Sequence, residues 1–170
     1  GGADICDSMA KDPAYAASVD IIGLHYPSDY KNYSVCQSFK KPFWASEESS
    51  SYDDLNGAAC WARVVNSHYV LSGMTSSIMW NLVGSYYHGT NWYASSMMNA
   101  DQPWSGHYDV MPVIWATAHI TQFTKVGWKY LAVGSGSGQL PAGGFYTTWV
   151  DPAGDDFTMN IVKIDHDHAP

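Results

Sequence analysis

Apolar and polar positions follow two different rhythms along this chain of 170 residues. Over roughly the first 125 residues, continuous apolar runs alternate with segments whose apolar residues recur every three or four positions. The continuous runs, which are typical of strands buried on both faces, are residues 19–27, 42–47 and 75–83. The segments with helical spacing are residues 4–18, with a break or bend at Pro13, 53–73 and 112–124. Buried strands that alternate with amphipathic helices predict parallel βαβ units.

From Gly127 onward the rhythm changes to that of antiparallel strands. The segments KYLAVGS, GGFYTTWV and DFTMNIVKI are separated by turns rich in Gly, Pro and Asp. We expect these segments to begin a β-sandwich. Because three parallel strands cannot cover themselves, we also expect the remainder of the parallel sheet to lie N-terminal to Gly1.

Composition narrows the possible functions. Hydrophobic residues make up 46% of the chain and charged residues 14%, which indicates a folded globular protein. The formal net charge is -8 and there is no basic cluster, which excludes nucleic acid as a partner. No apolar run approaches the ~20 residues that a membrane span needs. The 8 Trp, 12 Tyr and 5 Phe could fill a core or stack against the apolar faces of sugar rings.

The cysteines leave several pairings open. There are three of them, so at least one lacks a partner within this chain. The sequence does not say whether Cys6 and Cys36 pair, and Cys60, inside the helical run GAACWARVV, is either a core residue or half of a disulfide. The sequon at Asn32 would be glycosylated only in a secretory context.

The candidate chemistry lies where the predicted parallel strands end. Glu47 and Glu48 are the only two glutamates of the chain, and they close the second strand. The first strand ends in His25 and Tyr26, and the third ends at Trp80. In a parallel barrel the catalytic groups sit at the carboxyl ends of the strands. A carboxylate that attacks the anomeric carbon, beside an aromatic platform for the sugar ring, is the chemistry of a glycosidase.

Other interpretations of these residues remain open. Glu47 could be a surface salt-bridge residue and His25 a structural histidine. If the strand continues, Glu48 points away from Glu47, so the two are poor partners on one substrate and a second carboxyl should come from elsewhere. His166 and His168 would present two rings on one face of a strand, but without a third ligand nearby we expect no metal site and no cofactor.

Several blocks of the sequence resemble glycoside hydrolase family 59, the galactosylceramidase family. WASEESSSYDD, TSSIMWNLVGSYY, QPWSGHY and TQFTKVGWKYL carry the resemblance, which runs from about Val19 to the C-terminus. It implies an α/β fold in which residues 1–125 form the C-terminal half of a (β/α)8 TIM barrel and residues 126–170 form the first antiparallel strands of a β-sandwich. It also implies a retaining β-galactosidase of galactosylceramide and related galactolipids, lysosomal and served by a saposin-type lipid-transfer activator.

The resemblance also suggests roles for individual residues. It places Glu47 on the catalytic nucleophile, and Ser50 and Trp80 on substrate-contacting positions. His25 and Tyr26 match a segment that lines the same pocket. Trp92 stands where the family has a tyrosine, which keeps an aromatic ring and loses a hydroxyl. Cys60 matches a cysteine whose partner would lie beyond this chain.

One departure from the family pattern is an absence. The acid/base glutamate of the family follows an asparagine, and no Asn-Glu pair occurs here. We therefore expect that glutamate upstream of Gly1 and expect the 170 residues alone to be inactive. Two rival hypotheses remain: a retaining glycosidase of the same barrel type for another sugar, and a non-catalytic carbohydrate-binding protein.

Overall fold

The computed structural model describes residues 4–27, 33–50, 52–85, 89, 91–93, 95–100 and 105–163. The helices are α1 (Asp4–Lys11), α2 (Pro13–Ser18), α3 (Ser34–Ser38), α4 (Leu55–Val70) and α5 (Pro112–Thr121). The strands are β1 (Ile22–His25), β2 (Phe43–Glu48), β3 (Ser76–Met79), β4 (Val83–Ser85), β5 (Met98–Ala100), β6 (Asp109–Val110), β7 (Lys129–Tyr130), β8 (Gly138–Gln139), β9 (Phe145–Val150) and β10 (Phe157–Val162).

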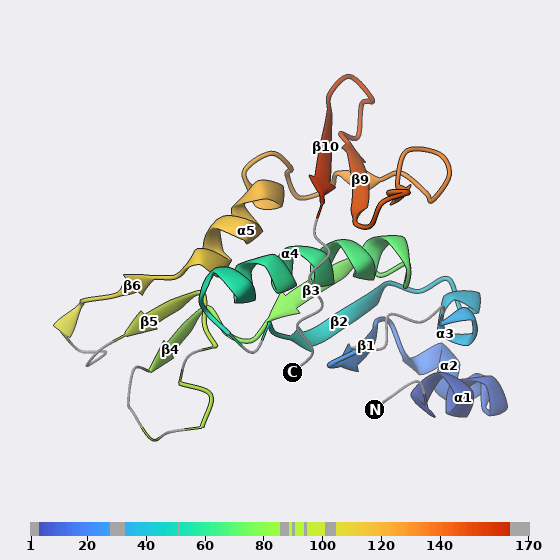
Figure 1. The fold of residues 1–170 in the computed structure, drawn as a ribbon. Helices are drawn as coiled ribbons and strands as arrows, with labels where there is room; N and C mark the ends of the chain where they lie inside the picture. The colour runs from blue at the N-terminus through green and yellow to red at the C-terminus, as the bar shows by residue number, and fades with distance from the viewer. Residues whose placement is uncertain are drawn as a thin grey trace.

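The predicted parallel strands form one sheet in the order β1-β2-β3. Both pairs are parallel, with Ile22 opposite Phe43 and Trp44 opposite Ser76. Figure 1 shows α4 lying along one face of this sheet, as expected for a helix that connects two parallel strands. The parallel βαβ arrangement predicted from the apolar runs is thus confirmed for the described residues.

The helix boundaries follow local capping signals. Asp12 accepts hydrogen bonds from the backbone N–H groups of Ala14 and Tyr15, so it ends one helix and begins the next. This confirms the break expected at Pro13, which occupies the first turn of α2 and lacks the N–H that a helix interior needs. Asp54 caps α4 in the same way by accepting from the N–H of Gly57.

The predicted C-terminal strands are antiparallel, as expected. β9 lies between β10 and β7, and β8 also pairs with β9. The sheet packs on α4 beside α5, so α4 lies between the parallel sheet and the C-terminal sheet (Figure 1). The division at residue 125 and the completion of this sheet into a sandwich remain predictions.

A third sheet lies between residues 83 and 112, where the apolar pattern predicts no strand. β4 and β5 pair in parallel, and β5 pairs with β6 in antiparallel fashion. These strands are two or three residues long, too short for a period-2 pattern to be recognised in the sequence.

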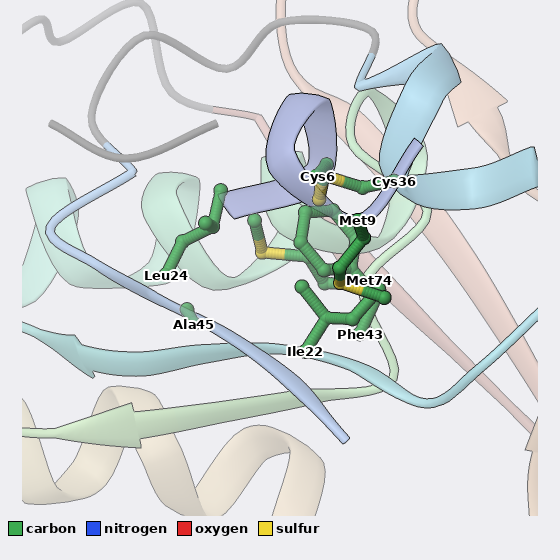
Figure 2. Close-up of a cluster of buried hydrophobic side chains, with 8 residues drawn as sticks. All are labelled: Cys6, Met9, Ile22, Leu24, Cys36, Phe43, Ala45 and Met74. Carbon is green, nitrogen blue, oxygen red and sulfur yellow. A yellow bond between two sulfur atoms is a disulfide. The ribbon is translucent and has the colours of Figure 1, made fainter. Parts of the chain in front are cut away.

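Two apolar cores hold the sheets and helices together. Figure 2 shows the first, between α1, α3 and the strands β1 and β2, where Cys6 and Cys36 form a disulfide. The second core joins α4 to α5 and to Trp149 of β9, and Cys60 is buried in it. The sequence left the Cys6–Cys36 pairing open, and the structure forms it. The burial of Cys60 fits the interpretation of that residue as part of a core.

A buried polar network crosses from α4 to the C-terminal sheet. The side-chain oxygen of Asn66 accepts hydrogen bonds from the Thr147 hydroxyl (3.0 Å) and the Asn160 amide (3.3 Å). The Asn66 amide donates to the carbonyl of Ala62 (2.8 Å). Because buried polar groups are costly unless they are satisfied, this network fixes one orientation of the sheet on the helix.

Candidate active site

The carboxyl ends of β1 and β2 bring the first pair of candidate residues together. His25 and Glu47 are direct partners in the strand register. The His25 Nε2 lies 3.1 Å from a carboxylate oxygen of Glu47, and the two side chains are 68% and 33% exposed. The Glu47 carboxylate is therefore oriented by a neighbour and still open to a ligand.

A bulge in β2 sets the direction of Glu47. The register passes from Leu24 opposite Ala45 to His25 opposite Glu47, so Ser46 is an extra residue in β2. The pairing of β2 with β3 is likewise irregular between Ala45 and Glu48. Bulges re-aim side chains and are common next to active sites.

Tyr26 lies beside this pair. Its backbone N–H donates to the Glu47 carbonyl oxygen (2.8 Å), and its ring meets the His25 ring edge-on with centroids 4.7 Å apart. Partial burial raises the pKa of the Tyr26 phenol above its ordinary value, and the carboxylates of Glu47 and Glu48 raise it further. The phenol thus keeps its proton at neutral pH and can donate a hydrogen bond.

Trp80 is held at the end of β3 through its backbone. Its N–H donates to the Glu48 carbonyl oxygen (2.7 Å), and its side chain is half-buried. The peptide bond from Trp80 to Asn81 is cis. The Asn81 side chain accepts a hydrogen bond from Ser96 (2.6 Å), which ties this strand end to the loop before β5.

Glu48 points away from Glu47, which confirms that the two glutamates diverge. Its side chain is buried, and one carboxylate oxygen lies 3.7 Å from Nε2 of His68 on α4. The other ring nitrogen of His68 lies 2.7 Å from the Ser77 hydroxyl on β3. No motif in the sequence marks His68 or Ser77. Their spacing fits an ordinary helix and an ordinary strand, so only the tertiary packing reveals them.

Ser50 and Trp92 lie farther along the loops. Ser50 is buried, and its hydroxyl donates to the carbonyl of Tyr52 (2.5 Å). Trp92 follows β4 and is 66% exposed. Nothing in these contacts assigns either residue to a substrate, so their roles remain predictions.

The described residues contain no group of three His, Cys, Asp or Glu side chains that could hold a metal ion. No helix among them has the length and apolar character needed to span a membrane. His166, His168 and Asn32 lie outside the described residues.

Comparison with known proteins identifies the family of the chain. The model of Glycosyl hydrolase family 59 matches residues 1–122. The chain belongs to this family. Membership in family 59 confirms the resemblance inferred from the sequence blocks.

Similar proteins of family 59 carry a consistent name. The chain is 41% identical over 169 residues to "Galactocerebrosidase" of Danio rerio, covering 99% of this chain and 25% of that protein. It is 42% identical over 165 residues to that of Mus musculus and 40% identical over 165 residues to that of Homo sapiens, in both cases covering 97% of this chain and 23% of the relative. The family 59 chain thus spans about a quarter of the length of these relatives.

Two solved structures share the fold of this family 59 chain. The catalytic domain of GH30 xylanase C from Talaromyces cellulolyticus superimposes with a TM-score of 0.55 at 11% identity, covering 88% of this chain and 37% of that one. The family 30 subfamily 8 xylanase Xyn30A from Clostridium acetobutylicum gives a TM-score of 0.59 at 14% identity, covering 85% and 36%. At such low identity the likeness shows the mixed α/β fold alone.

Proposed function

We propose that this chain is part of a retaining β-galactosidase that hydrolyses galactosylceramide and related galactolipids, with Glu47 as the catalytic nucleophile. The observation that carries the proposal is the Glu47 carboxylate, which is 33% exposed at a parallel strand end and held 3.1 Å from His25 in a chain of family 59. The names of the relatives support galactosylceramide as substrate. The parallel sheet with α4 would then be the C-terminal half of a TIM barrel.

In the first step of this mechanism, a Glu47 oxygen attacks the anomeric carbon and the bond from that carbon to the leaving oxygen breaks. A second carboxylic acid gives its proton to the leaving oxygen, and ceramide departs as the alcohol. In the second step, water attacks the anomeric carbon while the same second carboxylate takes its proton. The ester bond to Glu47 breaks, galactose leaves, and both carboxyl groups return to their starting states.

The neighbours of Glu47 have supporting roles in this proposal. His25 orients the attacking carboxylate, and the protonated Tyr26 phenol donates a hydrogen bond near it. Trp80, Trp92 and Ser50 contact the sugar or the residues around it. No metal or cofactor is needed, because the two carboxyl groups supply the whole reaction.

The second carboxyl group is expected outside this sequence. Retaining hydrolysis needs two carboxyls about 5–5.5 Å apart. The two glutamates present diverge, since Glu47 faces His25 and Glu48 faces His68. We therefore expect no hydrolysis of a chromogenic β-galactoside by the 170 residues alone, and turnover by them would contradict the proposal.

The cellular setting is also part of the proposal. The Cys6–Cys36 disulfide suits an oxidising compartment, which is consistent with a lysosomal enzyme made in the secretory pathway. A substrate with a ceramide tail must be lifted from a membrane, and we propose a saposin-type lipid-transfer protein as the partner that presents it.

The deciding experiment uses the full-length protein that carries this sequence. A 2-fluoro-galactosyl fluoride should label Glu47, identified by peptide mass spectrometry, and Glu47→Gln should lose turnover by several orders of magnitude while melting normally. Glu47→Ala with sodium azide should release an α-galactosyl azide, because the small anion occupies the vacated face. Labelling by the gluco analogue alone would favour another sugar, and near-normal turnover of Glu47→Gln would reject the nucleophile.

A further inference from the structure

A buried relay of three side chains lies directly behind the proposed nucleophile. It consists of Glu48 on β2, His68 on α4 and Ser77 on β3. The Glu48 side chain is 4% exposed and the His68 side chain 0% exposed. The carboxylate to imidazole distance is 3.7 Å, and the imidazole to hydroxyl distance is 2.7 Å.

The buried Glu48 carboxylate needs polar partners. A carboxylate taken out of water is costly unless a counter-charge or hydrogen bonds compensate it. One Glu48 oxygen accepts from the backbone N–H of Ser49 (3.1 Å), and the other faces the imidazole. The contact of His68 with Ser77 fixes the plane of its ring, so that Nε2 faces the Glu48 carboxylate at 3.7 Å. The relay therefore joins three elements that meet behind the site.

The relay acts where the strand pairing is irregular. The bulge at Ser46 interrupts the regular pairing of β2 with β1, and the pairing with β3 resumes only at Glu48. Past the irregularity, His25 pairs with Glu47 and Glu48 pairs with Met79. In addition, the Tyr26 N–H donates to the Glu47 carbonyl oxygen and the Trp80 N–H donates to the Glu48 carbonyl oxygen. A side-chain anchor on Glu48 thus restrains the backbone on which the Glu47 carboxylate turns.

We infer that the Glu48–His68–Ser77 relay is a positioning device: it anchors the bulged end of β2 to α4 and β3 and so holds the Glu47 carboxylate in its attacking direction. The Glu48 and His68 side chains are almost fully buried, so they act through Glu47 and not directly on the substrate. The inference rests on the proposed function of Glu47. Since a misplacement of about 1 Å can cost about 10²-fold in rate, loosening the anchor lowers kcat and leaves KM nearly unchanged.

The test uses the full-length protein with a chromogenic β-galactoside. Glu48→Gln keeps the shape and removes the charge. His68→Asn keeps a nitrogen for Ser77 and loses the reach to Glu48, whereas His68→Gln keeps a donor toward Glu48. Thr147→Val is the matched control, because it removes a buried hydrogen bond to α4 on the side facing away from β2.

The relay predicts a kcat about tenfold lower for Glu48→Gln and for His68→Asn, with KM within about twofold, and a smaller loss for His68→Gln. The rate at which the 2-fluoro sugar labels Glu47 should fall by the same factor as kcat. The double variant Glu48→Gln/His68→Asn should lose about as much as either single variant, because both break one device. Thr147→Val should lower the melting temperature without changing kcat.

Two results would overturn the inference. One is a kcat within about twofold of wild type for Glu48→Gln and His68→Asn, with only the melting temperature lowered as in Thr147→Val. The other is a change in KM with kcat unchanged. If His68→Asn does not fold, Ser77→Ala, which removes one hydroxyl, must give a labelling rate between wild type and Glu48→Gln. The wild type and Glu47→Gln in the same series test the proposed function separately.

Discussion

Opening the Cys6–Cys36 disulfide should destabilise the N-terminal part of the fold by an amount that can be calculated. The bridge closes a loop with a sequence separation of 30 residues. The chain-entropy relation then assigns it about 3.6 kcal/mol at 25 °C. Both cysteines are buried in the apolar core of Figure 2, so the sulfurs also contribute packing. Replacing both by alanine removes two atoms, each worth about 0.8 kcal/mol if counted as a methylene.

The stability lost on opening the disulfide can be measured by hydrogen exchange of the α1 amides in the full-length protein, with mass spectrometry as the readout. Reduced wild type keeps both sulfurs, and its α1 helix should open about 400-fold more often than that of oxidised wild type. This ratio corresponds to a free-energy difference of about 3.6 kcal/mol. The Cys6→Ala/Cys36→Ala variant should lose about 5 kcal/mol in total and should not respond to reductant. If oxidised and reduced wild type differ by less than about 1 kcal/mol, the assigned entropy is wrong.

Further predictions concern a buried tyrosine, a helix cap and the candidate site. Burial and the neighbouring Tyr130 raise the pKa of Tyr69 to about 12. The free energy of unfolding therefore keeps its full value below about pH 10 and falls by up to about 2.7 kcal/mol as the pH rises to 12, because the phenol ionises at a lower pH in the unfolded chain than in the folded one. In urea melts, Tyr69→Phe should not show this loss of unfolding free energy at alkaline pH. The same pH dependence in wild type and Tyr69→Phe would contradict the prediction. Asp54→Ala should cost about 1 kcal/mol in thermal melts, and Asp54→Ser much less; equal losses would exclude the capping role. His25→Ala should lower kcat about tenfold by freeing the Glu47 carboxylate, and unchanged kinetics would show that the 3.1 Å contact is incidental.

The sequence predicted the parts of the fold that depend on local patterns. Continuous apolar runs revealed the parallel strands, and the turn-rich segments after Gly127 revealed the antiparallel ones. The short strands β4 to β6 were missed because their pairing is decided by tertiary contacts, such as the buried hydrogen bond from Asn99 to Asp53. The helix α3 is a single short turn in a polar region and gave no periodic signal.

The sequence also predicted part of the candidate site. The strand ends placed His25, Tyr26 and Glu47 together, because the carboxyl ends of neighbouring parallel strands meet at one edge. Alternation along the strand also predicted that Glu48 would face the other way. The bulge at Ser46 and the partnership of Glu48 with His68 could not be predicted, because they depend on how three distant segments pack.

The buried hydrogen bonds at Asn66 have a consequence for any attempt to dissect this protein. A cut after residue 125 would remove the donors from β9 and β10 and would leave an amide oxygen facing a newly wetted helix surface. The C-terminal sheet would lose its acceptor in the same operation. Engineers who wish to graft or exchange that sheet must therefore transplant α4 with it, or redesign the polar contacts on both sides of the cut.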